Sequence, residues 1–184
     1  IVLTDARDVL YFMEPDEPTD FETILSQSGF KMMFGAEAYY GDPPFRSESL
    51  HHYCSLNSGV CFGYVSKFRD VWQRAVEALD SAIAGGFDSS SVTKHAKWVG
   101  NDQYWLWRVC DQDSEVMIDR SCEVIQNMWD DKWGKAVNFD LIYDYVDGTI
   151  YNQRFDTHPV IFHSPGTLGR NGLSQVYKIL TGKY

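Results

Sequence analysis

The first ten residues constrain the fold of this chain more than any other stretch. Ile1-Val2-Leu3-Thr4 is typical of a buried strand, Asp5 and Asp8 follow it, and Val9-Leu10 is apolar again. Ligands of open α/β sheets collect beyond the carboxyl ends of the strands, where two carboxylates can bind Mg²⁺ or Mn²⁺. Asp also favours turns and helix caps, so a structural role for both acids remains open at this point.

Composition limits the classes of protein. The 184 residues, 44% of them hydrophobic, predict one globular domain over 1–184. The formal charge of −10 argues against a nucleic-acid groove, which would be basic, and against an anionic membrane surface. No apolar run has the length of a bilayer span, so we expect no membrane span. The chain opens at Ile1 inside a strand, and we expect it to be a piece of a longer protein.

The cysteines Cys54, Cys61, Cys110 and Cys122 do not have the spacing of a zinc site. Cys54 and Cys61 can pair in an oxidising compartment. The alternative, favoured for Cys61 and Cys110, is a small buried apolar side chain.

Strand and helix patterns alternate along the chain, which predicts an α/β fold. Helix Val65–Ile83 should bury a face formed by Phe68, Val71, Trp72, Ala75, Val76 and Leu79. The other expected helices cover 20–28, ended by Gly29, an aromatic segment through 109 that Asp102 precedes, and 173–180. The expected strands cover 1–4, 30–36, 117–119, 123–127 and 159–163, with a hairpin of 141–146 and 149–151 around Asp147-Gly148. Loops are expected over 14–19, 41–49 and 85–92.

Five motifs follow one another in a fixed order. They are Thr-Asp-x-x-Asp at 4–8, Leu-Asn-Ser-Gly-x-x-x-Gly-Tyr at 56–64, Asp-Gln at 102–103, Ile-Gln-Asn at 125–127 and His-x-x-Gly at 163–166. In this order the set resembles the glycosyltransferase domain of the procollagen lysyl hydroxylases and related collagen glycosyltransferases, over nearly the whole chain.

The resemblance implies a GT-A glycosyltransferase fold, with a mixed, mostly parallel sheet flanked by helices. It implies that Asp5, Asp8 and His163 bind Mn²⁺ (or Mg²⁺), which holds the diphosphate of a UDP-sugar donor. The family's first strand and helix, which hold the uracil and ribose, have no counterpart in this chain.

The resemblance also gives roles to other residues. Asn57, Ser58 and Gly59 match the segment near the donor sugar, although the residues alone equally favour a strand-end turn. Asp102 matches a catalytic carboxylate that faces the reacting sugar; its alternative is a helix cap. The remaining substrate-binding candidates are Asn101, Gln103, Gly166 and Arg170.

The sequence departs from the family pattern in three places. Asn101 stands where the family has an acid. The family also has an aromatic residue in the loop that follows the stretch matching Ala36-Glu37-Ala38, and Tyr39 or Tyr40 would replace it. Arg170 lies one residue beyond the family's lysine and can reach a diphosphate.

We expect the other histidines to be structural: His51, His52, His95 and His158.

Three functions follow as hypotheses. The first is a metal-dependent hexosyltransferase that moves glucose or galactose from UDP-glucose or UDP-galactose to hydroxylysine or galactosyl-hydroxylysine of a collagen-like protein, by resemblance in the endoplasmic reticulum lumen. The second is a catalytically silent scaffold, which the departures favour. The third is a GT-A transferase with another protein or glycan acceptor. Joint retention of Asp5, Asp8, Asp102 and His163 favours an enzyme, because neighbouring acids repel each other without a metal.

Overall fold

The structure, a computed structural model, describes residues 1–5, 8–11, 19–37, 55–85, 102–128, 143–146, 149–164, 174, 176–178 and 181. The expected loop at 41–49, most of the loop at 85–92 and the Asp147-Gly148 turn lie outside these residues. Within the expected final helix over 173–180, the described residues are helical.

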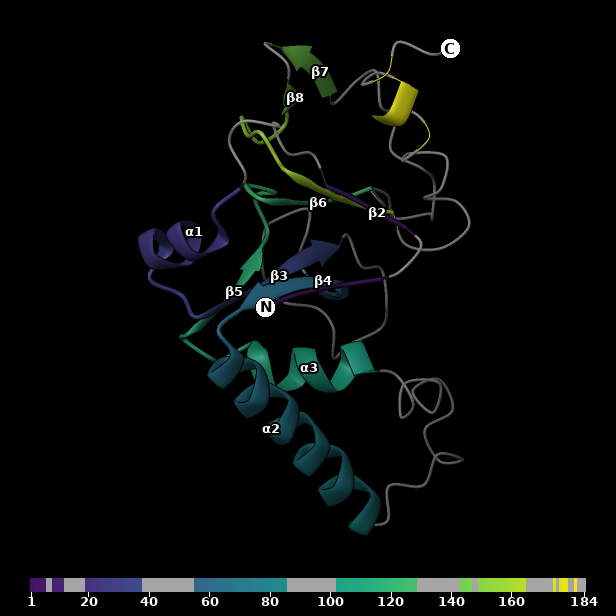
Figure 1. Cartoon of the computed structure of the whole chain (residues 1–184). Coiled ribbons are helices and arrows are strands. Elements are labelled where there is room, and N and C mark those ends of the chain that lie inside the picture. The colour runs from purple at the N-terminus through teal and green to yellow at the C-terminus, as the bar shows by residue number, and fades with distance from the viewer. Residues whose placement is uncertain are drawn as a thin grey trace. The chain divides into compact units, whose positions relative to one another are not determined.

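Helices and strands alternate in the described part of the chain (Figure 1). The helices are α1 (Phe21–Ser28), α2 (Val65–Ala84) and α3 (Asp102–Cys110). The strands are β1 (Val2–Thr4), β2 (Val9–Tyr11), β3 (Met32–Glu37), β4 (Ser55–Gly63), β5 (Val116–Asp119), β6 (Ile125–Asn127), β7 (Tyr143–Val146), β8 (Thr149–Asn152) and β9 (Ile161–His163). The predicted α/β class is therefore confirmed.

The described strands form three sheets, where the sequence predicted one. Their orders are β1-β4-β3-β5, β2-β9-β6 and β7-β8. Strand β9 pairs parallel with β6 and antiparallel with β2, so the three-stranded sheet is mixed. Strands β1 and β2 are edge strands of different sheets.

The chain divides into two compact units. Unit 1 contains Ile1, Phe21–Met33 and Phe62–Met117, and unit 2 contains Val2–Asp20, Phe34–Cys61 and Ile118–Tyr184. All three helices that carry a label belong to unit 1, and the short strands β2, β6 and β9 belong to unit 2.

Local sequence signals set the helices of unit 1. Helix α1 ends where Gly29 adopts a φ of +76°, the left-handed conformation that glycine accepts without a steric penalty. Helix α2 packs against α3 and buries Phe68, Val71 and Ala75, as predicted. Val76 was predicted to be buried with them, but it is 53% exposed.

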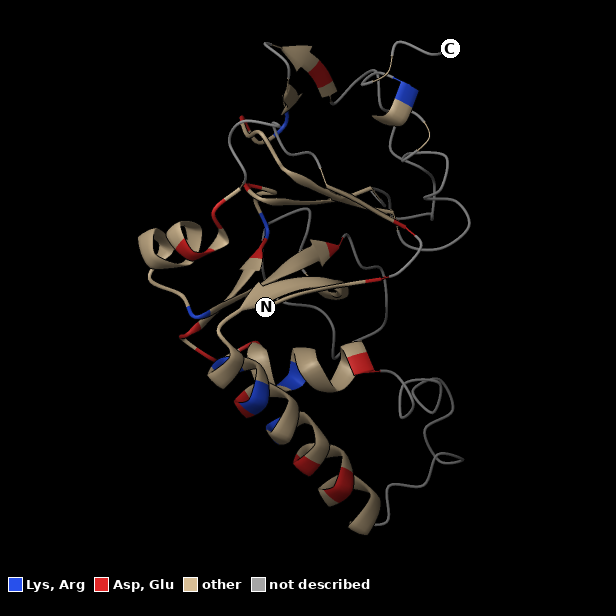
Figure 2. Cartoon of the chain, in the orientation of Figure 1, with Lys and Arg blue, Asp and Glu red and all other residues tan. Residues whose placement is uncertain are grey.

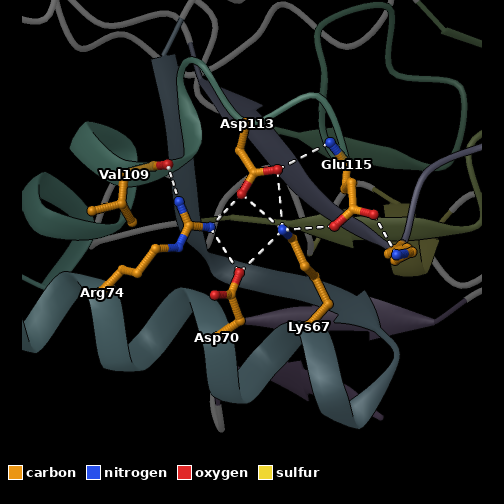
Figure 3. Close-up of polar contacts among 7 residues, drawn as sticks. Lys67, Asp70, Arg74, Val109, Asp113 and Glu115 are labelled. Atoms are coloured by element: carbon orange, nitrogen blue, oxygen red, sulfur yellow. Dashed lines mark hydrogen bonds and ion pairs between the residues drawn. The ribbon is translucent and has the colours of Figure 1, made fainter.

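Lys67 is buried on the same side of α2, although helical periodicity predicts no buried charge there. Its ammonium donates to Asp70 at 3.1 Å, to Asp113 at 2.8 and 3.1 Å and to Glu115 at 3.1 Å (Figure 3). A buried ammonium is tolerated only when it is paired and hydrogen-bonded, which these carboxylates achieve.

Two further cations complete this charge cluster, which comprises Lys31, Lys67, Asp70, Arg74, Asp113 and Glu115. Arg74 pairs with both Asp70 and Asp113 and donates to the Val109 carbonyl of α3 at 3.1 Å (Figure 3). Lys31 pairs with Glu115. Two of the three cations, Lys67 and Arg74, come from the N-terminal half of α2, where the basic residues of that helix gather (Figure 2). It thereby joins α2 to the end of α3 and to the segment that enters β5.

In unit 2 the side chain of Asp119 shapes the turn between β5 and β6. It is fully buried and accepts hydrogen bonds from the backbone N–H groups of Glu123, Val124 and Ile125 at 2.8 to 2.9 Å. Cys122 within this turn has a φ of 52°. The strand β6 follows this turn and pairs with β9, with Asn127 opposite His163. The turn therefore helps to position the end of β9.

We predict that Lys67→Met lowers the free energy of unfolding by about 2–3 kcal/mol, because the buried Asp113 then loses one of the two cations that it pairs with, Lys67 and Arg74. Chemical denaturation at pH 7 measures this change. The control is Lys31→Met, which removes a cation from an ion pair whose side chains are 54% and 42% exposed. It should cost less than about 1 kcal/mol. Equal losses of unfolding free energy in the two variants would contradict the expectation that the buried ion pairs of Lys67 contribute more than the exposed pair of Lys31.

A second prediction concerns pH. Burial alone would raise the pKa of the Asp113 carboxyl, but the hydrogen bonds from Lys67 and its other donors hold that pKa below its usual value. A carboxyl with a lowered folded-state pKa stabilises the fold above its unfolded pKa of about 3.9 and loses this contribution as the pH falls further. We therefore expect the stability gap between the wild type and Asp113→Asn to narrow below about pH 4. A gap that stays constant down to pH 2.5, about a unit and a half below that reference, would contradict the prediction.

Candidate metal centre

Asp5, Asp8 and His163 come together in unit 2. Asp5 follows β1, Asp8 precedes β2 and His163 ends β9, and one ligand atom from each lies within 4.8 Å of the other two. Two ligands of one Mg²⁺ ion can be at most about 4.2 Å apart, twice the bond length of about 2.1 Å. The Asp5 side chain is 59% exposed, so a small rotation of its carboxylate closes this difference.

Backbone pairing brings these three residues to one place. Val9 lies opposite His163 in the antiparallel β2–β9 pair, which puts Asp8 beside the end of β9. The Ser164 N–H donates to the Asp8 carbonyl at 2.8 Å, and the Met128 N–H donates to the His163 carbonyl at 2.7 Å. These bonds fix the backbone of both ligands, so their side chains need little rearrangement to share an ion.

Gly59 of β4 forms the floor of the cluster. Its carbonyl accepts the Asp5 N–H at 2.8 Å. A Cβ atom built on Gly59 would lie 2.3 Å from His163 Cε1, 2.5 Å from His163 Nε2 and 2.7 Å from Asp5 Oδ2. Glycine is required here because any side chain would occupy the space of the ligands.

The state of His163 suits a metal ligand. The residue is 1% exposed, and its Nε2 makes no hydrogen bond to any described residue. Asp5 Oδ2 lies 3.4 Å from His163 Nε2. Burial lowers the pKa of the imidazole, while the charges of Asp8 and Asp5 act in the opposite direction. With its Nε2 deprotonated, the ring would direct a lone pair toward the two carboxylates, and a divalent cation would satisfy all three groups.

The donor set also indicates which ions fit. Two carboxylates and one imidazole match Mn²⁺ and Mg²⁺ better than ions that prefer sulfur ligands. Cys61, Cys110 and Cys122 are buried, in agreement with the prediction for Cys61 and Cys110. Cys54 lies outside the described residues.

The residues expected near the donor sugar are Asn57, Ser58 and Gly59 of β4. Asn57 is 4% exposed and has both ends of its amide hydrogen-bonded within unit 2, to Glu37 and to Gly59. Gly59 contributes its backbone to the metal cluster, and Ser58 is half-buried between them. Asn57 therefore connects Glu37 to the backbone of Gly59, and the contact of these residues with a donor sugar stays a prediction.

Asp102 and Gln103 begin α3 in unit 1, with Asp102 exposed and Gln103 half-buried. The catalytic role of Asp102 stays a prediction. Asn101, Gly166 and Arg170 lie outside the described residues, as do Tyr39, Tyr40, His51, His52 and His95. His158 is described and its Nδ1 lies 2.9 Å from Thr149 Oγ1, which agrees with the structural role expected for it.

Sequence reasoning missed Glu37, the last residue of β3. Its carboxylate accepts a hydrogen bond from Asn57 Nδ2 at 2.9 Å. A single acid that ends the apolar strand 32–37 was the available signal, but nothing in the spacing linked it to Asn57, which lies on another strand.

Gly59→Ala tests the geometry of the cluster. We expect it to weaken Mn²⁺ binding by about 10- to 100-fold, the usual range for disturbed metal surroundings, because the added methyl displaces His163. Calorimetric titration or the Mn²⁺ resonance signal measures the affinity. The control is Gly35→Ala, a glycine of unit 2 whose Cβ would meet the side chain of Ile125 at 2.9 Å. It should lower stability and leave the affinity unchanged; equal affinities in both variants would contradict the role of Gly59.

Comparison with known proteins gives no further guide to this site. The chain matches no family model and no curated protein sequence. Among the described helices, none is long and apolar enough to cross a membrane. Function must therefore be inferred from the residues of the site itself.

Proposed function

We propose that this chain is a metal-dependent glycosyltransferase domain of GT-A type. In this proposal it moves a hexose from UDP-glucose or UDP-galactose to hydroxylysine or galactosyl-hydroxylysine of a collagen-like protein. The cluster of Asp5, Asp8 and His163 carries the proposal. The mixed α/β fold and the ordered motifs that resemble collagen glycosyltransferases support it.

The chemistry of the cluster suits a nucleotide-sugar donor. Two carboxylates and a neutral imidazole on one side of a cation leave its other coordination positions open for phosphate oxygens. A bound divalent cation would offset the negative charge that develops on the departing diphosphate. The part of the protein is to hold the three ligands in place, which the bonds of Gly59 and Ser164 do.

Asp102 has the proposed role of a carboxylate that faces the reacting sugar. A fixed negative charge there would stabilise positive charge at the sugar carbon as the bond to the diphosphate breaks. Asp102 is the first residue of α3, and its side chain is exposed.

The experiment is a UDP-release assay on the full-length protein with Mn²⁺, a panel of UDP-sugars and collagen-like acceptor peptides. We expect Asp8→Asn to lower turnover by at least about 100-fold, since even loss of an outer partner of a metal ligand costs about 10- to 100-fold. The matched control is Asp144→Asn, an exposed acid of β7 in the same unit, which should retain full activity. Chelation of the metal should abolish turnover in the wild type.

Asp102→Asn separates catalysis from metal binding. If Asp102 faces the reacting sugar, the variant should lose turnover and still bind Mn²⁺ with wild-type affinity. A folded wild-type protein that binds Mn²⁺ but releases no UDP from any sugar would contradict the enzyme and favour the scaffold. Turnover only with other protein or glycan acceptors would retain the transferase and replace the collagen-like acceptor.

A further inference from the structure

We propose that Glu37 and Asn57 are positioning residues of the cation site, acting through the backbone of Gly59. This inference rests on the proposed function in one respect, because it requires that Asp5, Asp8 and His163 bind a divalent cation. It adds two residues that do not touch the cation, and it gives Asn57 a role different from the expected contact with the donor sugar.

The hydrogen bonds form a continuous series across strands β3 and β4. Asn57 Nδ2 donates to Glu37 Oε2 at 2.9 Å, and Asn57 Oδ1 accepts the Gly59 N–H at 3.0 Å. The Gly59 carbonyl in turn accepts the Asp5 N–H at 2.8 Å. One buried amide therefore connects a carboxylate at the end of β3 to the residue that holds a metal ligand.

Gly59 is the point at which a small movement reaches both kinds of ligand. Its carbonyl fixes Asp5, and its Cα faces His163 so closely that an added Cβ would lie 2.3 Å from the ring. Protein interiors pack too densely to absorb such a shift without moving neighbours. Rotation of the peptide at Gly59 would therefore displace Asp5 and press on His163 together.

The chemistry of Asn57 explains why this residue type is needed. The series requires an acceptor toward the Gly59 N–H and a donor toward the Glu37 carboxylate, and an amide supplies both. An apolar side chain would leave the buried Gly59 N–H without its acceptor, which is unfavourable. A carboxylate would keep the bond to Gly59 but would repel Glu37.

Asn57→Asp distinguishes positioning from simple charge attraction. The substitution adds a negative charge near the proposed cation site of a chain whose formal charge is −10. Electrostatic attraction alone would therefore tighten Mn²⁺ binding. Positioning predicts the opposite: repulsion between the new carboxylate and Glu37 moves Gly59, and the affinity falls by about 10-fold or more.

The double variant Asn57→Asp with Glu37→Gln exchanges the two groups. The new amide at position 37 donates to the new carboxylate at position 57, which still accepts the Gly59 N–H, and the formal charge equals that of the wild type. We expect this exchange to restore the Mn²⁺ affinity to within about threefold of the wild type, because each hydrogen bond is formed again. Failure of the exchange to restore any affinity, with the protein folded, would overturn the proposal.

If Asn57→Asp does not fold, two variants of Glu37 test the positioning role instead. Glu37→Gln keeps an acceptor for Asn57 Nδ2 and should retain the affinity, whereas Glu37→Ala removes the acceptor and should weaken it by about 3- to 10-fold. Because Glu37 is half-buried, both substitutions should be tolerated. Equal affinities in these two variants would overturn the proposal.

The measurement is Mn²⁺ titration of the full-length protein, with thermal unfolding in a chelator as the test of folding. Wild-type protein that binds no Mn²⁺ would overturn the proposed function and this inference with it. Wild-type protein that binds Mn²⁺, with Asn57→Asp binding as well or better, would overturn the positioning role alone. The expected order of affinity is wild type, then the exchange, then Asn57→Asp.

Discussion

The absence of a side chain at Gly59 is the constraint on which the candidate site depends. A Cβ at this residue would overlap both His163 and Asp5, so the ligands can meet only where the strand β4 presents bare backbone. Glycine usually weakens a strand interior, since it packs nothing and loses much conformational freedom on folding. Here the hydrogen bonds to Asp5 and Asn57 offset that weakness and give the glycine one conformation.

The charge cluster around Lys67 is the corresponding specialised feature of unit 1. It places three cations and three carboxylates on α2, the segment after α3 and the start of β3, so that the cluster carries no net charge. The negative charge of the chain therefore resides elsewhere. Lys67 and Asp113 are its buried members, and loss of one partner of a buried ion pair is costly, so this pair opposes separation of α2 from the segment after α3.

The sequence predicted element types well and their side-chain environment less well. The helix Phe21–Ser28 ended by Gly29, the long helix from Val65 and the strand that ends at His163 all have strong local signals, and all are present. The burial of Lys67 and the exposure of Val76 depend on which acids lie on segments far away in the chain, which helical periodicity does not contain. The same holds for the separation of the strands into three sheets.

The candidate site shows the same division. The order of the motifs led to Asp5, Asp8 and His163, which do lie together, because strand ends are visible in the sequence. The roles of Asn57 and Gly59 could not be inferred, since a polar Asn-Ser-Gly segment is equally compatible with binding a sugar or with supporting a neighbour. The hydrogen bond from Asn57 to Glu37 on β3 supports the proposed positioning role, and this partner depends on strand register, which the local sequence does not contain.

The three candidate ligands are buried to different extents, and this difference affects how the binding of an ion and of an anionic ligand would depend on each other. His163 is buried, Asp8 is half-buried and Asp5 is exposed, so an ion held by them would face solvent on one side. Such an ion would be retained weakly until a second, anionic ligand completes its coordination. Linkage requires that the two ligands strengthen each other's binding equally. The metal content of the isolated protein would then depend on whether a phosphate-bearing partner is present.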